Sequence, residues 1–206
     1  MHPIERLRYV ARAGSAPDRI LVAESIPALA AFSHNPQMLL VALRQLIARQ
    51  PESPGLLALG AHMLHALDSL DAGWDFSQSL DDDRTVDIAE TTAIAESGRT
   101  DVIDSIASGL ASGGSGVEVL CPAGTKSWLE DCRESFRSAA VVTPLGSRLP
   151  PLLWAAFSGP GDDGPAAMSL ERLSLEKFDE VIGPDGVAPL SSWVPDCPDV
   201  AELARR

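Results

Sequence analysis

Cysteine is scarce in this chain of 206 residues, which has only Cys121, Cys132 and Cys197. An odd number of cysteines without a Cys-x-x-Cys pair indicates neither a disulfide framework nor a structural zinc site. His62 and His65 add no metal ligand set, because zinc-binding helices use a four-residue histidine spacing and a third ligand. We therefore predict reduced thiols, solvated histidines, no metal site and no cofactor.

Basic residues and long apolar runs are also few. There are 16 lysines and arginines against 29 aspartates and glutamates, which gives a formal net charge of −13. This charge repels a phosphate backbone over most of the surface and disfavours nucleic-acid binding as a main role, although a local basic patch stays compatible with it. No apolar run reaches the ~18 residues of a membrane span, and residues 1–6 lack the apolar core of a signal peptide. We expect a globular, cytoplasmic protein without membrane attachment.

What the chain does have, first, is helical periodicity over its first seventy residues. Between Pro36 and Pro51, and again after Ser53 and Pro54, apolar residues recur at the spacing of amphipathic helices. Ser53 is a candidate N-cap, with Pro54 at the first helical position. Residues 3–13 and 17–32 are also predicted to be helical, with a kink or break at Pro27.

The segment 71–84 interrupts this periodicity with several aspartates, including the run 81–83. Adjacent residues point in different directions, so the run is interpreted as a solvated linker instead of a cation site. This places an N-terminal helical subdomain at residues 1–80 and a second unit at residues 84–206.

The second unit has short strand-like runs that alternate with helices. We predict strands at residues 85–89, 117–121 and 139–143, and a helix over residues 102–110 with Thr100 as its cap. This alternation is typical of parallel sheets with right-handed crossovers. The predicted fold class is therefore α/β, with an N-terminal helical subdomain followed by a small Rossmann-like, mostly parallel sheet flanked by helices.

The stretch 117–127 combines a strand end, a cysteine and the start of a helix. Cys121 ends the strand, where the helix dipole and Lys126 are expected to favour the thiolate and make it a candidate catalytic group. Gly124, Thr125, Lys126 and Ser127 form a candidate site for one phosphate or carboxylate at the helix N-terminus. Ser127 and Glu130 also fit a capping box, which explains the turn without a ligand. It is not a nucleotide-binding P-loop, because Val119 stands where that loop requires glycine.

Three segments carry a resemblance to a known family: HPIERLRYVAR at 2–12, PLGSRLPPLLW at 144–154 and FDEVIGPDGV at 178–187. They resemble an actinobacterial branch of the translation initiation factor 2B alpha/beta/delta and methylthioribose-1-phosphate isomerase family. The resemblance implies an N-terminal helical domain and a Rossmann-like sheet. It also implies a homo-oligomer or a protein partner, because the initiation-factor members use the fold for assembly, or a phosphorylated small molecule as ligand.

The isomerases of this family carry a catalytic cysteine in a His-Cys-Asn-Thr/Ala-Gly motif. The stretch 120–124 matches its cysteine, small residue and glycine, but not its histidine or asparagine. The family's Gly-Ala-Asp-Arg aspartate has no counterpart, and Asp163, in the glycine-rich loop 159–164, is a weak substitute. Because isomerisation needs an acid/base pair, we expect a diverged, non-catalytic binding or regulatory protein. The alternative is a sugar-phosphate isomerase that uses Cys121.

Overall fold

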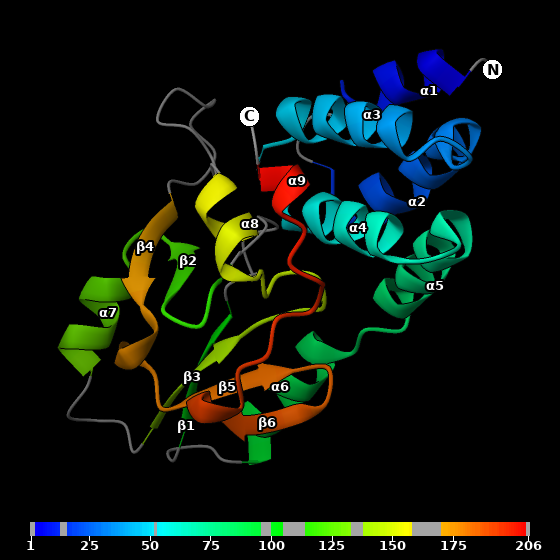
Figure 1. Ribbon diagram of the computed structural model, residues 1–206. Helices are drawn as coiled ribbons and strands as arrows, with labels where there is room; N and C mark the ends of the chain where they lie inside the picture. Colours follow the sequence, from blue (N-terminus) through cyan, green and yellow to red (C-terminus); the bar gives the residue numbers. More distant parts are fainter. Residues whose placement is uncertain are drawn as a thin grey trace.

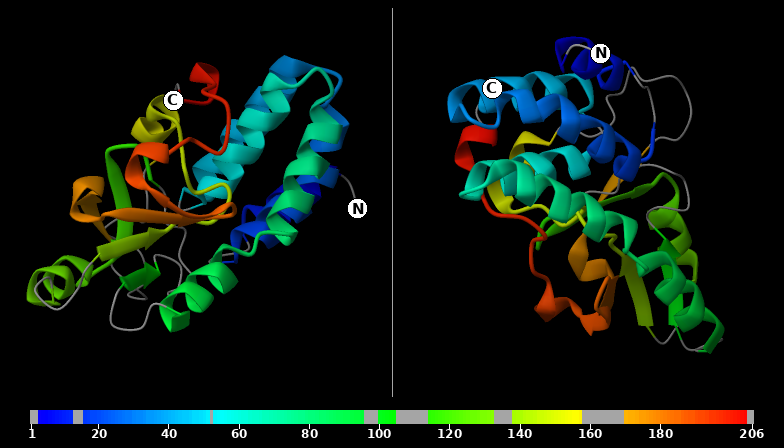
Figure 2. Two further views of the ribbon diagram at one scale, coloured as in Figure 1. Left: turned by 90° about the horizontal axis from the view of Figure 1, so that it is seen from below. Right: turned by 90° about the vertical axis from the view of Figure 1, so that its right-hand side faces the viewer.

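The computed structural model describes residues 3–12, 16–51, 53–95, 100–104, 114–132, 138–157 and 170–204. It begins with a layer of helices and continues into two small sheets (Figure 1). The helices of the first layer are α1 (Pro3–Val10), α2 (Asp18–Leu29) with the 3-10 turn η1 (Ala30–Phe32), α3 (Pro36–Arg49), α4 (Pro54–His65) and α5 (Ser69–Asp81). In both views of Figure 2 these helices lie together on one side of the strands.

The ends of α3 and α4 follow the local signals in the sequence. Asn35 caps α3 by accepting hydrogen bonds from the N–H groups of Gln37 and Met38, both at 3.1 Å. Ser53 caps α4 by accepting one from Leu56 at 3.2 Å, which confirms the predicted cap. Of the predicted kink or break at Pro27, the break is wrong, because α2 continues through this residue, and the kink stays a prediction.

Three predicted elements between residues 71 and 104 are wrong. The predicted linker 71–84 is largely the helix α5, which Asp68 caps and which buries Gly73, Phe76 and Ser77 while its aspartates face solvent. The predicted strand at 85–89 is the start of the helix α6 (Thr85–Ala95). Where a helix was expected from residue 102, the chain forms β1 (Thr100–Asp104), and the rest of that prediction lies outside the described residues.

The strands form two separate sheets. The larger has the order β1, β3 (Ser138–Val142), β5 (Glu180–Gly183) and β6 (Gly186–Pro189), with β1, β3 and β5 parallel and β6 antiparallel to β5. The smaller pairs β2 (Glu118–Pro122) with β4 (Leu170–Ser174), antiparallel. The strand predicted over 117–121 is therefore present, but as part of a two-stranded antiparallel sheet and not of the parallel one. The molecule is a mixed α/β fold whose small, mostly parallel sheet is flanked by helices.

The larger sheet is covered on both faces. Because side chains alternate along a strand, Ala140, Val142 and Ile182 pack on one face with Ala89 of α6. On the other face, Val141 and Val181 pack against the β2–β4 sheet and the helix α7 (Thr125–Cys132). The sheet is thus a central layer between α6 and the smaller sheet.

The largest core cluster joins the helical layer to segments from late in the chain. These segments are α8 (Pro151–Ala156), which follows β3, and α9 (Ala201–Ala204), which follows the 3-10 turns η3 (Leu175–Lys177) and η4 (Leu190–Ser192). Leu203 of α9 lies so close to α4 that a Cβ at Gly60 would be 3.1 Å from its Cδ1 atom. The division into 1–80 and 84–206 stays a prediction, and the two parts share this core. Among the described residues, no helix is long and apolar enough to span a membrane.

Candidate functional site

Cys121 lies in the interior of the molecule, on β2. Its side chain is 0% exposed and packs in one apolar cluster with Val119, Leu129 and Leu173. Burial raises the pKa of the thiol to about 12, and Glu171, which faces Cys121 in the β2–β4 register, adds to the increase. The expectation that the helix dipole and Lys126 favour the thiolate is therefore wrong, because desolvation outweighs both. At physiological pH this cysteine is a neutral apolar side chain.

The turn after Cys121 has the conformation that its sequence indicates. Gly124 has φ = 93°, in the left-handed region that favours glycine, and the Thr125 hydroxyl donates a hydrogen bond to the carbonyl of Pro122 at 2.6 Å. The helix α7 begins at Thr125, two residues before the predicted N-cap at Ser127. Ser127 and Glu130 therefore lie inside the helix, and Glu130 accepts a hydrogen bond from the Lys177 ammonium at 3.3 Å.

The position predicted for an external anion holds a carboxylate of the chain itself. The Lys126 backbone N–H, in the first turn of α7, donates a hydrogen bond to Glu171 Oε1 at 2.8 Å. Negative charge is favourable at a helix N-terminus, and Glu171 supplies it from the neighbouring strand β4. The residues Gly124, Thr125, Lys126 and Ser127 are together as expected. Anion binding by these residues stays a prediction. An external anion would have to compete with Glu171 for the Lys126 N–H.

The second predicted catalytic group cannot be placed. Asp163 and the rest of the loop 159–164 lie outside the described residues. Among the residues that the structure describes, the carboxylate opposite Cys121 is that of Glu171, which is already bonded to Lys126. The pair of acid and base that an isomerase needs is therefore not assembled by the described residues around Cys121.

A cavity lies at the carboxyl ends of β3 and β5, where open α/β sheets commonly bind ligands. It has a volume of about 680 Å³ and includes Leu145, which follows β3, Pro184, which follows β5, and residues near the start of α6. Asp83 holds this edge together, since it accepts hydrogen bonds from the Thr85 N–H at 3.0 Å and the Leu145 N–H at 2.9 Å. The run 81–83 resembles a solvated linker in sequence, so the role of Asp83 at this edge is not predicted from the sequence.

The charges around this cavity are mostly negative. Asp82, Asp83 and Asp87 line it, and its one lining cation is Arg84, which is bonded to Asp87 at 3.0 Å. An added phosphate would face uncompensated carboxylates here, so the cavity favours a neutral or cationic group. Within the described part of the chain, no cluster of three or more His, Cys, Asp or Glu side chains is arranged to hold a metal ion.

A buried ion pair joins the loop after β3 to the segment before α9. Arg148 Nε donates a hydrogen bond to Asp196 Oδ1 at 2.7 Å, and Asp196 Oδ2 accepts two more from the N–H groups of Gly146 and Arg148, at 2.9 and 3.0 Å. The side chain of Asp196 is only 1% exposed, and desolvation raises the pKa of its carboxyl although Arg148 acts in the opposite direction. This network attaches the segment before α9 to the loop after β3.

His62 connects the network to the helical layer. Its Nε2 lies 3.0 Å from the carbonyl oxygen of Asp196, and its ring stacks on Phe76 with centroids 4.7 Å apart. The prediction of a solvated histidine is therefore wrong for His62, whereas His65 is exposed as expected. No signal in the sequence could have identified these contacts, because Asp196 is 134 residues away.

Comparison with known proteins shows a likeness of fold. No family model and no curated protein matches the sequence. Among solved structures, the chain is similar to eIF2B beta from Chaetomium thermophilum, with a TM-score of 0.60 and 11% sequence identity, over 98% of this chain and 92% of that chain. At 11% identity this similarity shows a shared fold and nothing about activity. The chain therefore has an eIF2B-like fold, in agreement with the resemblance of its segments 2–12, 144–154 and 178–187.

Proposed function

We propose that this protein is a non-catalytic binding protein with an eIF2B-like fold, which acts by associating with a protein partner or with a second copy of itself. The observation that carries the proposal is the state of Cys121, a fully buried thiol with a pKa of about 12. A nucleophile or a proton-transfer group needs a pKa matched to its task and access to substrate, and Cys121 has neither.

The charges of both candidate sites also support a role other than sugar-phosphate isomerisation. Glu171 occupies the start of α7, and Asp82, Asp83 and Asp87 dominate the cavity at the sheet edge. A phosphorylated ligand is implied by the family resemblance, but at both sites it would meet carboxylates of the chain itself. We therefore infer that this fold serves protein–protein association, as in the initiation-factor members. Phosphate binding is a secondary hypothesis.

The large aromatic side chains near the C-terminal end of α8 are not available to a partner. Trp154 and Phe157 belong to the core, at 7% and 3% exposure, and Trp193 packs partly buried against the second core cluster. Exposed apolar side chains include Tyr9, Val117 and Val194, on separate parts of the chain. Single exposed residues of this kind are common, so they do not define the interface by themselves.

The oligomeric state tests the form of the proposal that involves a second copy. Sedimentation velocity from low to high micromolar concentration is expected to show a dimer or a larger species. A monomer at every concentration would exclude self-association and leave only a different protein as partner.

Activity tests the alternative. A methylthioribose-1-phosphate isomerase assay is expected to show no turnover with the purified protein. Turnover that disappears in Cys121→Ser, but persists in the matched buried-thiol control Cys197→Ser, would overturn the non-catalytic proposal in favour of an isomerase. Folding of both variants is checked by near-ultraviolet circular dichroism.

A further inference from the structure

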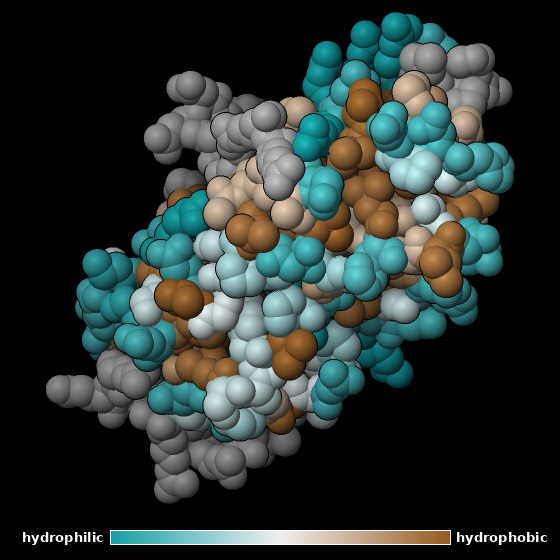
Figure 3. Space-filling view, in the orientation of Figure 1, coloured by the Kyte–Doolittle hydropathy of each residue, from teal (hydrophilic) through white to brown (hydrophobic). Residues whose placement is uncertain are grey.

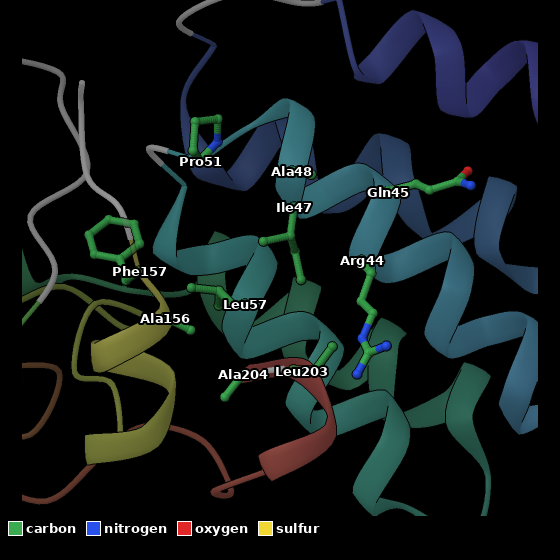
Figure 4. A pocket seen from close by; sticks show the side chains of 10 residues that line it. All are labelled: Arg44, Gln45, Ile47, Ala48, Pro51, Leu57, Ala156, Phe157, Leu203 and Ala204. Carbon is green, nitrogen blue, oxygen red and sulfur yellow. The ribbon is translucent and has the colours of Figure 1, made fainter. Parts of the chain in front are cut away.

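An apolar cavity opens between α3, α4, α8 and α9, away from both sites described above. Its volume is about 550 Å³, within the range of roughly 300–1,000 Å³ that is typical of small-molecule sites. Figure 4 shows Phe157 at one end and Arg44 at the other, with Ile47, Leu57 and Leu203 between them. On the space-filling surface, hydrophobic residues form a band over α3 and α4 in this region (Figure 3).

Arg44 is positioned by the fold at the polar end of this cavity. Its Nε and Nη2 both donate to the backbone carbonyl of Glu202, the former at 3.0 Å, which fixes the guanidinium against α9. An arginine has five N–H donors, so this contact leaves others that can bind a carboxylate. Gln45 is the other polar residue of the lining.

The charge of the cavity is opposite to that of the whole protein. None of its lining residues is acidic, and α3 carries Arg44 and Arg49 without an aspartate or glutamate, although the chain has a net charge of −13. A single cation at the edge of an apolar cavity complements a molecule with one carboxylate and a hydrocarbon body.

We propose that this cavity binds a small apolar carboxylic acid, with its carboxylate on Arg44 and its hydrocarbon chain along Ile47, Leu57 and Leu203 toward Phe157. The proposal is independent of the association role, since it uses no residue of the sheet edge or of the Cys121 turn. The ligand would contact α3, α8 and α9 together.

Calorimetric titration with octanoate, decanoate and decanol tests this proposal on the intact chain. We expect one saturable site for decanoate, about fourfold tighter binding for each added CH₂, and therefore about a sixteenfold gain from octanoate to decanoate. Decanol should bind about tenfold more weakly than decanoate, because it lacks the charge that Arg44 recognises. Equal affinity for decanoate and decanol, or no saturation by decanoate at about 1 mM, would overturn the proposal.

Variants separate the two ends of the cavity. Arg44→Gln should lower decanoate affinity to that of decanol while leaving decanol binding unchanged, which also shows that the cavity has survived the substitution. The matched control Arg49→Gln, on the same helix but outside the lining, should bind both as before. Ala48→Phe, at the exposed edge of the cavity, should block both ligands. Unchanged decanoate binding in Arg44→Gln and Ala48→Phe would refute the location.

Discussion

The carboxylate of Glu171 on β4 accepts a hydrogen bond from the backbone N–H of Lys126 at 2.8 Å, so a strand side chain completes the first turn of α7. The same residue faces Cys121 across the β2–β4 ladder. One glutamate therefore both stabilises the helix start and opposes ionisation of the neighbouring thiol.

Replacement of Glu171 is expected to weaken this junction. Glu171→Ala removes the acceptor and the charge at the helix N-terminus, which should lower the free energy of unfolding by about 0.5–1 kcal/mol in urea titrations. Glu171→Gln keeps an amide oxygen as acceptor and should cost less. The exposed Glu176→Ala is the matched control. If inorganic phosphate raises the melting temperature of Glu171→Ala but not of the wild type, the predicted anion site exists and is normally occupied by Glu171.

The thiol of Cys121 is expected to react only after unfolding. With a pKa of about 12, only about one thiol in ten thousand is ionised at pH 8. Iodoacetamide labelling, followed by mass spectrometry of peptides, should modify Cys121 and Cys197 at least a hundredfold more slowly in the native protein than in urea, because both are buried with raised pKa values. Rapid native labelling of Cys121 would contradict the buried position and, with it, the main support for a non-catalytic role.

These two thiols also predict how stability depends on alkaline pH. In the unfolded chain they ionise near the ordinary pKa of 9.0, whereas in the folded protein their pKa values are about 12. The unfolded state therefore releases protons first, and the free energy of unfolding should fall as pH rises from about 9 toward 12. Cys121→Ala should flatten this fall in urea titrations across that range. A dependence identical to that of the wild type would show that the thiol is not desolvated.

The ion pair of Arg148 and Asp196 is expected to be important for stability. Asp196→Ala leaves the Arg148 guanidinium buried without its carboxylate and removes an acceptor for Gly146, so we expect a loss of about 3–5 kcal/mol in the free energy of unfolding. The exposed Asp199→Ala should stay within about 0.5 kcal/mol of wild type. Chemical denaturation measures both. A loss below about 1 kcal/mol in Asp196→Ala would mean that solvent reaches this pair.

Protonation of His62 should destabilise the fold at mildly acidic pH. Burial lowers the pKa of His62 below its ordinary value of 6.5, so the unfolded chain binds this proton first. The contribution to stability is present above pH 6.5 and is lost as pH falls from there through the folded pKa. His62→Gln should reduce this loss in unfolding titrations between about pH 5 and 8. The exposed His65→Gln should retain most of it, and equal effects of the two variants would argue against the buried contact.

Local signals explain what could be predicted of this fold. Asn35, Ser53 and the prolines that follow them mark the starts of α3 and α4, and those helices form where expected. The helix α5 is not predicted because its fully buried residues are only Gly73, Phe76 and Ser77, and one large apolar side chain among them shows no clear periodicity between the aspartates. Its stability depends on packing against α2 and α4, which no short window of sequence reveals.

The candidate site was less predictable because its partners are distant in sequence. The apolar run of β2 predicts a buried strand. Its pairing partner β4 begins 48 residues after β2 ends, so the local pattern does not show to which sheet β2 belongs. Glu171 is 45 residues from Lys126, so the sequence around Cys121 does not indicate that a carboxylate lies beside it. The prediction that Cys121 lies on a strand before a turn is confirmed. The raised pKa of its thiol comes from burial and from Glu171, which are set by parts of the chain distant in sequence.

The return of α9 to the helical layer has a consequence for the order of folding. The core of α3 and α4 includes Cys197, Val200 and Leu203, which are made more than a hundred residues after the helices they cover. During synthesis these helices thus emerge before the residues that cover part of their apolar surface. The contacts that cover it are distant in sequence, so forming them costs loop-closure entropy. The apolar core of the helical layer is therefore completed only after the segment that contains α9 has been synthesised.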